Sequence, residues 1–260
     1  MQRRPGFPAR LDSSAAAGVP RAGASAARAG GSASAPVPVP QGLGLDSAAV
    51  RARMVQRLAE GGISAPAVLQ AMGAVERHRF VDTALVNQAY EDTSLPIGLG
   101  QTISKPSIVA RMTELLLGAE GARAGGLGRV LEIGTGCGYQ AAVLARVARE
   151  VYTIERLRAL HEKARDNLRP WRLANVHLIL GDGMAGYVKG APYAAIIAAA
   201  GGDAIPDAWV QQLAVGGRLV APMASSGGRQ VLVVIDKTPQ GLKQSALEAV
   251  HFVPLKSGIA

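Results

Sequence analysis

The sequence predicts a doubly wound α/β fold whose sheet carries an antiparallel strand pair at one edge. From residue 129 onward, short apolar runs typical of buried strands alternate with helical patterns. The run at 130–133 passes into three glycines at alternate positions and then directly into a helical pattern, which indicates a strand, a tight turn and a helix. Two terminal strand-like runs, joined through residues 239–241, indicate the antiparallel edge.

The elements of this sheet follow one another in order along the chain. Apolar runs predict the strands, and glycine or proline marks most of the turns between them. Helical spacing predicts helices after Gly138 to about residue 149, over 157–168, and from Pro206 onward. The predicted strands span residues 130–133, 151–154, 176–180, 194–199, 218–221, 230–235 and 246–253.

Short amphipathic helices precede the sheet. Apolar residues at helical spacing predict a first helix between an N-cap at Asp46 and a glycine pair at 61–62, and Ser64 is the expected N-cap of a second. Their position ahead of the sheet predicts an N-terminal helical extension that covers one sheet edge. A further helix begins at Pro106, for which Ser104 is a candidate cap.

The first 44 residues differ in composition from the rest of the chain. They are rich in Ala, Gly, Pro, Ser and Arg and have little to bury, so we expect a disordered tail and rank an organelle transit peptide below it. One folded domain is expected over 45–260. Within it, residues 45–128 supply the N-terminal helices and a functional loop, and residues 129–260 supply the core.

Composition narrows the classes of function. The net charge is +9, but part of it lies in the tail, and an aromatic content of 4% leaves few residues to stack on bases, so we expect no nucleic-acid partner. No apolar run reaches the roughly 18 residues of a membrane span, and no apolar segment follows the basic start. A single cysteine excludes an intrachain disulfide, and the scattered histidines predict no metal site. We expect a cytoplasmic monomer.

The glycine turn indicates the ligand. The spacing Gly134-x-Gly136-x-Gly138 differs from the dinucleotide pattern, in which the third glycine comes one position later. This favours S-adenosylmethionine, which has no pyrophosphate. Acids at the ends of the next two predicted strands could accept hydrogen bonds from a ribose and an adenine. The candidate cofactor-binding residues are Glu132, Gly134, Thr135, Gly136, Gly138, Glu155, Asp182 and Gly183.

An ordered loop is predicted over residues 90–106, where prolines and glycines interrupt any sustained period. It reads Asp92-x-x-Leu-Pro-Ile-Gly-x-Gly-Gln-Thr-Ile-Ser104. With the glycine turn, the Gly181-Asp-Gly183 turn and the terminal Phe252-Val-Pro-Leu255, this loop resembles the protein-L-isoaspartate O-methyltransferase family from about residue 50 onward. The resemblance implies a Rossmann-like class I methyltransferase sheet.

The resemblance also implies a function. The family transfers a methyl group from S-adenosylmethionine to the free α-carboxylate of isoaspartyl residues in damaged proteins and peptides, which starts their repair through a succinimide. It places Ser104 at the substrate carboxylate, with Thr102 as a second donor and Asp92 in a shaping or positioning role. Judged without the resemblance, Ser104 is more simply a helix cap.

This chain departs from the family at three places. It has Tyr193-Ala194-Ala195 where an acid is usual, Gly201-Gly202 where a proline pair is frequent, and Cys137 where serine is more usual. We predict retained activity, with weaker support of the cofactor site near Ala194 and a looser loop near Gly201. Three alternatives stay open: a methyltransferase acting on a small molecule or RNA, a nicotinamide oxidoreductase, and a cofactor-binding relative with weakened catalysis.

Overall fold

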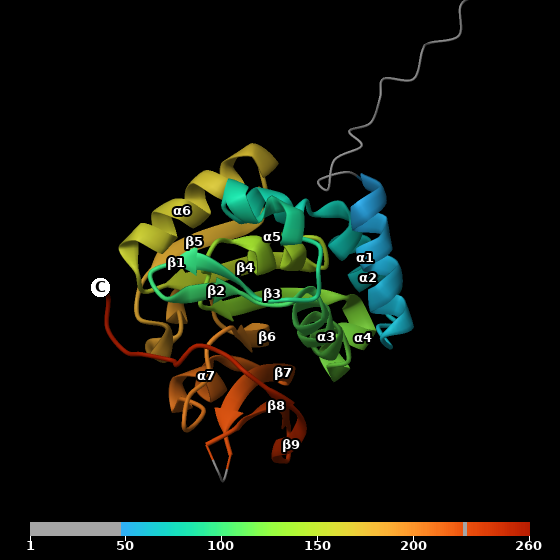
Figure 1. Cartoon of the computed structure of the whole chain (residues 1–260). Coiled ribbons are helices and arrows are strands. Elements are labelled where there is room, and N and C mark those ends of the chain that lie inside the picture. Colours follow the sequence, from blue (N-terminus) through green and yellow to red (C-terminus); the bar gives the residue numbers. More distant parts are fainter. Residues whose placement is uncertain (1–47, 226–227) are drawn as a thin grey trace, which may run out of the picture. The chain divides into compact units, whose positions relative to one another are not determined.

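A seven-stranded sheet forms the centre of the molecule, in the strand order β5-β4-β3-β6-β7-β8-β9. The computed structural model describes residues 48–225 and 228–260 (Figure 1). The predicted tail at 1–44 and the predicted cap at Asp46 therefore lie outside the described residues. The strands are β3 (Leu127–Ile133), β4 (Ala148–Glu155), β5 (Val176–Leu180), β6 (Tyr193–Ala198), β7 (Leu213–Ala224), β8 (Gln230–Thr238) and β9 (Gly241–Val250).

The topology confirms the predicted doubly wound sheet. Strands β5, β4, β3, β6 and β7 pair in parallel, whereas β7–β8 and β8–β9 pair antiparallel. The chain moves from β3 outward to β4 and β5, then returns to the other side of β3 to lay down β6. The strand order reverses at β3, and ligands of open α/β sheets bind beyond the carboxyl ends of the strands at such a point.

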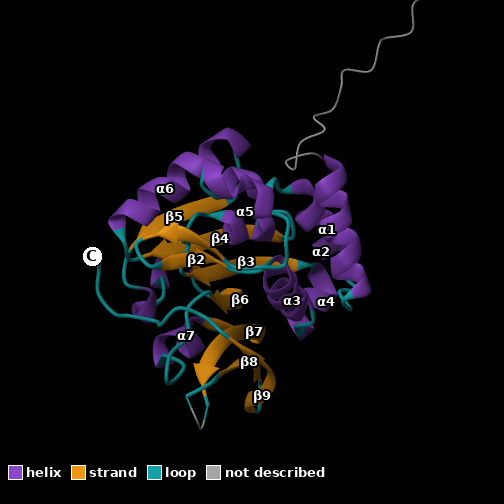
Figure 2. Ribbon diagram, viewed as in Figure 1, coloured by secondary structure: helices purple, strands orange, loops and turns teal. Residues whose placement is uncertain are grey.

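Helices cover both faces of the sheet (Figure 2). Val130 of β3 packs into a core shared with α3 and α4, while the next residue, Leu131, packs into the opposite core with Trp209 of α7. This alternation is what a strand buried on both faces requires. The helices are α1 (Ala48–Glu60), α2 (Pro66–Ala74), α3 (Pro106–Leu117), α4 (Glu120–Gly125), α5 (Tyr139–Leu144), α6 (Arg158–Leu168) and α7 (Asp207–Gln212).

Several elements differ from the sequence predictions. Helix α5 ends at Leu144 rather than near residue 149, because β4 already begins at Ala148. Helix α4 was not predicted, since its glycines lower helix propensity. The loop at 90–106 contains a small antiparallel hairpin, β1 (Leu95–Gly98) and β2 (Gln101–Ile103). Short 3-10 helices occur at Arg77–Phe80, Thr83–Gln88, Arg169–Trp171, Gly183–Ala185 and Val188–Gly190.

The N-terminal helices form an outer layer. Helices α1 and α2 pack against each other and against α3 and α5, so they extend one helical face instead of covering an edge strand. The predicted caps were wrong for both α2 and α3. The N-cap of α2 is Ala65, and that of α3 is Lys105, and neither makes a side-chain cap hydrogen bond. Carboxylates from distant positions take this role, Glu114 for α2 and Asp92 for α3.

Candidate active site

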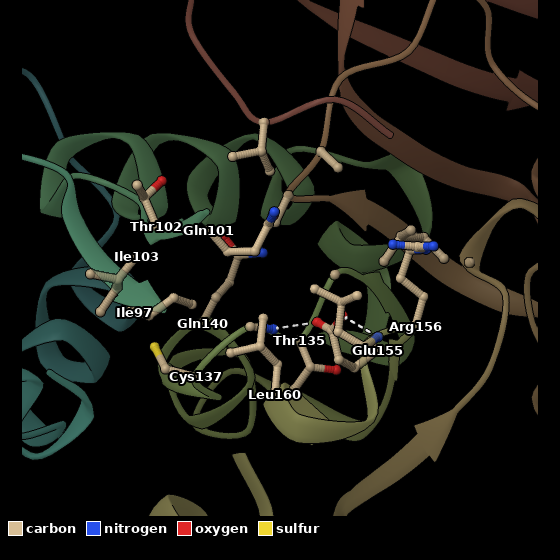
Figure 3. A pocket seen from close by; sticks show the side chains of 18 of the residues that line it. Ile97, Gln101, Thr102, Ile103, Thr135, Cys137, Gln140, Glu155, Arg156 and Leu160 are labelled. Atoms are coloured by element: carbon tan, nitrogen blue, oxygen red, sulfur yellow. Dashed lines mark hydrogen bonds between the residues drawn. The ribbon is translucent and has the colours of Figure 1, made fainter. Parts of the chain in front are cut away.

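A cavity of about 270 Å³ opens at the carboxyl ends of β3, β4 and β6, at the switch point of the sheet. In Figure 3, Gln101 and Thr102 of the hairpin lie on one side of the pocket, and Glu155 and Arg156 lie on the other. Most of the lining comes from four segments, and Val109, Gly183, Ala199 and Ala200 complete it. The four segments are the β1–β2 hairpin with Ser104, the glycine turn with Tyr139 and Gln140, the end of β4 with the start of α6, and residues 253–256.

The glycine turn is shaped by backbone geometry that side chains disfavour. Gly134, Gly136 and Gly138 all have left-handed φ angles, of 91°, 56° and 90°. The amide groups of Gly134 and Thr135 donate to the Ile154 carbonyl at 2.9 and 3.1 Å, which ties the turn to β4. A Cβ atom at Gly136 would lie 3.1 Å from Cδ1 of Ile97. A side chain at Gly136 would crowd Ile97, so the bare backbone gives the hairpin room beside the turn.

Glu155 projects from the end of β4 into the pocket. Its side chain is held by two amide groups, because Gly136 N donates to Oε2 and Leu157 N donates to Oε1, both at 2.9 Å. Each carboxylate oxygen has a further lone pair. The carboxylate is thus fixed in place and can still accept hydrogen bonds from two neighbouring hydroxyl groups.

Glu132 lies behind the turn and does not line the pocket. It is fully buried, and Thr153 Oγ1 donates to its Oε2 at 2.5 Å while Thr135 Oγ1 lies 2.6 Å from the same Thr153 hydroxyl. Burial raises the pKa of Glu132 to about 8. The side-chain amide of Gln140 acts against this shift and lowers the pKa of Glu132, although Gln140 Nε2 and Glu132 Oε1 make no hydrogen bond of standard geometry within the described residues. Gln140 lines the pocket, and sequence reasoning missed it.

Asp182 and Gly138 also lie outside the lining, whereas Gly183 is part of it. Asp182 Oδ1 accepts from Met184 N at 2.8 Å, and Oδ2 accepts from Gly258 N at 2.7 Å. Gly138 is the N-cap of α5, where a Cβ atom would lie 3.0 Å from Leu168. The residues of the predicted cofactor set that reach the pocket are Gly134, Thr135, Gly136, Glu155 and Gly183.

The hairpin brings Ser104 and Thr102 to the same pocket. Ser104 is half-buried, and its hydroxyl makes no hydrogen bond with any residue the structure describes. Asp92 does not join them. Its two carboxylate oxygens accept from Ser107 N at 2.8 Å and Ser107 Oγ at 2.7 Å, so it fixes the loop to α3 and borders a different cavity. Its shaping role fits this geometry, and a direct role at the substrate does not.

Residues 251–260, called here the C-terminal segment, form a wall that the sequence did not predict. Strand β9 ends at Val250, three residues earlier than expected, because the chain leaves the sheet and crosses toward β6. Gly201 N donates to Val253 O at 2.8 Å, and Leu255 N donates to Gly201 O at 2.7 Å. In Figure 1 this segment runs in red from β9 past β6. Val253, Pro254, Leu255 and Lys256 line the pocket.

The family model for protein-L-isoaspartate(D-aspartate) O-methyltransferase matches residues 49–260. The chain belongs to this family. A protein-L-isoaspartate O-methyltransferase of Methylibium petroleiphilum is 64% identical over 220 residues, which cover 84% of this chain and 81% of that protein. The corresponding protein of Leptothrix cholodnii is 62% identical over 219 residues, which cover 84% of this chain and 77% of that protein.

Solved structures agree in fold. A protein-L-isoaspartate O-methyltransferase superposes with a TM-score of 0.71 at 28% identity, over 80% of this chain and 67% of that one. A Plasmodium falciparum beta-aspartate methyltransferase in complex with S-adenosyl-L-homocysteine gives a TM-score of 0.68 at 24% identity, over 79% of this chain and 98% of that one. These comparisons confirm the predicted class I methyltransferase sheet.

Family membership decides between the functions left open by the sequence. The chain is an S-adenosylmethionine-dependent protein-L-isoaspartate O-methyltransferase, which excludes the nicotinamide oxidoreductase and the methyltransferase of a small molecule or RNA. Among the helices of residues 48–225 and 228–260, none combines the length and apolarity that a bilayer crossing requires. The same residues contain no cluster of three or more metal-ligating side chains.

The three departures of this methyltransferase from its family pattern lie in different surroundings. Ala194 is at the amino end of β6 and does not line the pocket. Gly201 and Gly202 are paired through their backbones with Pro254 and Met223, so the loop is anchored rather than loosened. Cys137 lines the pocket but is buried, and burial raises the pKa of its thiol to about 11. A protonated thiol suits a packing role better than a nucleophilic one.

Proposed function

We propose that this pocket is the site at which the free α-carboxylate of an L-isoaspartyl residue is methylated. One observation carries the proposal: a single cavity brings Ser104 and Thr102 of the hairpin together with Gly134, Gly136 and Glu155. The hairpin side serves the substrate, and the glycine-turn side serves S-adenosylmethionine.

The cofactor side offers groups that match the adenosyl part of S-adenosylmethionine. Glu155 has free lone pairs for the two ribose hydroxyls. Gly134 and Gly136 present bare backbone to the adenosyl group. Gln140 lines the pocket, and its side-chain amide interacts with the buried Glu132 behind the turn, so it supports the turn rather than offering a free donor. Asp182 contributes indirectly, by holding the C-terminal segment through Gly258.

The substrate side needs no strong base. The α-carboxylate of an isoaspartyl residue is ionised at neutral pH and is itself the nucleophile. S-adenosylmethionine, when bound, supplies an activated methyl group. The Ser104 hydroxyl donates a hydrogen bond to one carboxylate oxygen and so directs the other oxygen toward the cofactor side, with Thr102 as a second donor. Positioning and exclusion of water therefore carry the catalysis.

We further propose that the enzyme works as a monomer in the cytoplasm, on proteins and peptides and apart from nucleic acids and membranes. The low aromatic content and the single cysteine support this setting. Light scattering of the purified protein tests the monomer, and a dimer at micromolar concentration would contradict it.

A Ser104→Ala variant tests the assignment of the substrate side. We expect kcat/KM on an isoaspartyl peptide to fall by about a hundredfold, as for the loss of one catalytic hydrogen-bond donor. The affinity for S-adenosylhomocysteine, measured by calorimetry, should stay unchanged because Ser104 lies on the hairpin side.

The matched control is Ser94→Ala, at an exposed position of the same loop that does not line the pocket.

A second control is a peptide of the same sequence with aspartate in place of isoaspartate, which should accept no methyl group from the wild type. Equal turnover of the wild type and Ser104→Ala would sink the assignment of Ser104.

A further inference from the structure

The tip of the β1–β2 hairpin carries a leucine in an unusual conformation. Leu99 has a left-handed φ of 53° and stands between Gly98 and Gly100, whose φ angles are 98° and 68°. Side chains other than glycine, asparagine and aspartate seldom adopt this conformation. Leu99 is nevertheless 60% exposed and belongs to none of the hydrophobic clusters among the described residues. Neither backbone geometry nor core packing explains a leucine here.

The tip rests on a rigid base. Lys163 Nζ from α6 donates to the Ile97 carbonyl at 2.9 Å, and the Ile97 side chain packs on Gly136 of the cofactor turn. The side-chain amide of Gln101 donates to the Leu99 carbonyl at 3.4 Å. The backbone of the left-handed tip is thus bonded from both strands of the hairpin, which limits the positions that the leucine side chain can take. Backbone outliers that are held in this way are concentrated at ligand-binding sites.

Leu99 faces the reaction pocket. It lines the same cavity as Thr102 and Ser104, and the C-terminal segment adds Pro254 and Leu255 to that lining. Successive residues of an extended peptide are about 3.3 Å apart. Leu99 and Ser104 line one cavity, so an extended substrate peptide with its isoaspartyl group at Ser104 can run along the hairpin and bring a flanking side chain to the tip.

We propose, on the basis of the function proposed above, that Leu99 determines specificity by contacting an apolar side chain adjacent to the isoaspartyl residue of the substrate. The contact removes the methyl groups of Leu99 from water, and it also buries the apolar side chain of the substrate residue, which favours binding. The enzyme accordingly prefers isoaspartyl sites flanked by an aliphatic residue over sites flanked by a small polar one.

The test uses isoaspartyl peptides that differ only at the residue before or the residue after the isoaspartyl position, with leucine or serine there. For the wild type we expect kcat/KM to be about tenfold higher with leucine on at least one side. In Leu99→Asn this ratio should fall to about one, because asparagine accepts the left-handed backbone but offers no apolar contact. Leu99→Gly should behave in the same way.

Leu242→Asn is the matched control, since Leu242 is 51% exposed on β9 and does not line the pocket. It should keep the wild-type ratio. Affinity for S-adenosylhomocysteine should be unchanged in Leu99→Asn, and its melting temperature should not fall, because asparagine tolerates the left-handed backbone. These two results separate a contact with substrate from a structural role.

The outcomes distinguish this inference from the function on which it rests. Failure of the wild type to methylate any of the isoaspartyl peptides would overturn the proposed function. Methylation of all of them, with the same leucine-to-serine ratio in the wild type and Leu99→Asn, would overturn the role of Leu99 alone. An equal loss of turnover on leucine and serine peptides would also overturn it, because that result assigns Leu99 to the hairpin and not to specificity.

Discussion

The titration of one residue, Glu132, makes the unfolding free energy of the cofactor-free protein depend on pH. Burial raises the pKa of its carboxyl group from 4.5 to about 8. The folded state thus binds this proton more tightly than the unfolded state does. The resulting contribution to stability is fully present below pH 4.5 and is lost as the pH rises through about 8.

Replacement of Glu132 by Gln should remove this dependence, because a neutral amide has no proton to lose. We expect the unfolding free energy of the wild type, relative to Glu132→Gln, to fall by on the order of a few kcal/mol between pH 4.5 and pH 8. Urea denaturation at several pH values measures the difference. Glu91→Gln, at an exposed position, controls for the loss of one surface acid. Parallel curves for wild type and Glu132→Gln would contradict the prediction.

Some site residues were predictable from the sequence, and others were not. Glu155 and the glycine turn follow from local patterns, since residues at the ends of parallel strands meet at one sheet edge. Ser104 was placed at the substrate only by the resemblance of its loop to the family. Such patterns do not give the direction in which a side chain points. Asp182 therefore appeared to face an adenine, whereas in the structure its carboxylate bonds Met184 and Gly258. Gln140 carried no signal, because it occupies an ordinary helical position.

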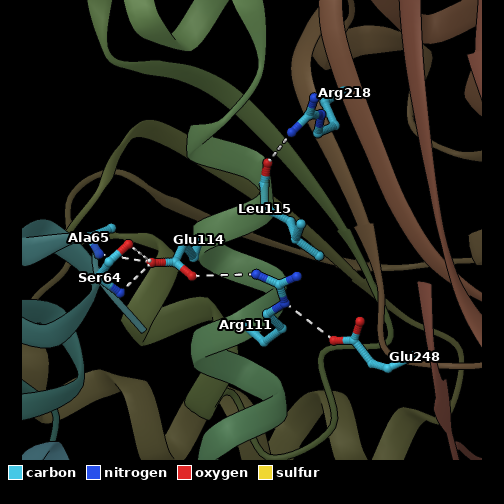
Figure 4. A network of polar contacts seen from close by, with 7 residues as sticks. All are labelled: Ser64, Ala65, Arg111, Glu114, Leu115, Arg218 and Glu248. Atoms are coloured by element: carbon cyan, nitrogen blue, oxygen red, sulfur yellow. Dashed lines mark hydrogen bonds and ion pairs between the residues drawn. The ribbon is translucent and has the colours of Figure 1, made fainter. Parts of the chain in front are cut away.

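At the scale of elements, two helices begin without a local cap and are capped by carboxylates from elsewhere in the chain. Figure 4 shows Glu114 of α3 reaching the start of α2. Its Oε1 accepts from Ser64 N at 2.7 Å and Ala65 N at 2.8 Å. Burial by itself would raise the pKa of Glu114, but the hydrogen bonds from Ala65 and Ser64 outweigh it and hold the pKa below its ordinary value. A capping carboxylate also stabilises the helix dipole.

Glu114→Ala should lower the unfolding free energy by about 1–2 kcal/mol at neutral pH, because two amide groups lose their acceptor. The pKa of Glu114 is depressed in the folded state, so its contribution is present above pH 4.5 and is lost as the pH falls through the folded-state value. The gap between wild type and variant in thermal denaturation should therefore narrow in acid.

Glu248→Ala removes the outer member of the same network, which contacts Arg111 at 3.2 Å. Both of these side chains are more than a third exposed, so the change should be below about 0.5 kcal/mol. A loss for Glu248→Ala as large as that for Glu114→Ala would contradict the capping role.

Strands were more predictable than helix ends. The strands of the parallel sheet contain short, largely apolar runs, and each was predicted with its type correct. Helix caps were mispredicted because Ser64 and Ser104 fit the local rule, while the actual acceptors lie 50 and 15 residues from the groups they bond. Tertiary contacts of this kind leave no local signal in the sequence.

At the scale of the whole molecule, the division of the chain into a tail over residues 1–44 and a folded domain over 45–260 remains a prediction, which truncation can test. The family match begins at residue 49, and the residues that line the pocket fall between positions 97 and 256. A variant that starts at residue 45 should therefore keep its kcat/KM on isoaspartyl peptides within a factor of about two of the full-length value. Its melting temperature should change by no more than about a few degrees. A large loss of turnover would assign the tail a role in the reaction.

The C-terminal segment forms one wall of the pocket, and we expect this wall to open locally much more often than the whole domain unfolds. Its amide groups at Leu255, Gly258 and Ala260 bond to Gly201, to Asp182 and to Arg156. Beyond Phe252, most of its residues are exposed, so little buried apolar surface resists its local opening. Strand β6, by contrast, is buried along almost its whole length, so we expect its amide groups to open only with global unfolding. In hydrogen–deuterium exchange, these three amide protons should exchange long before those of β6. Their exchange rates therefore report how often the C-terminal segment opens and uncovers the pocket.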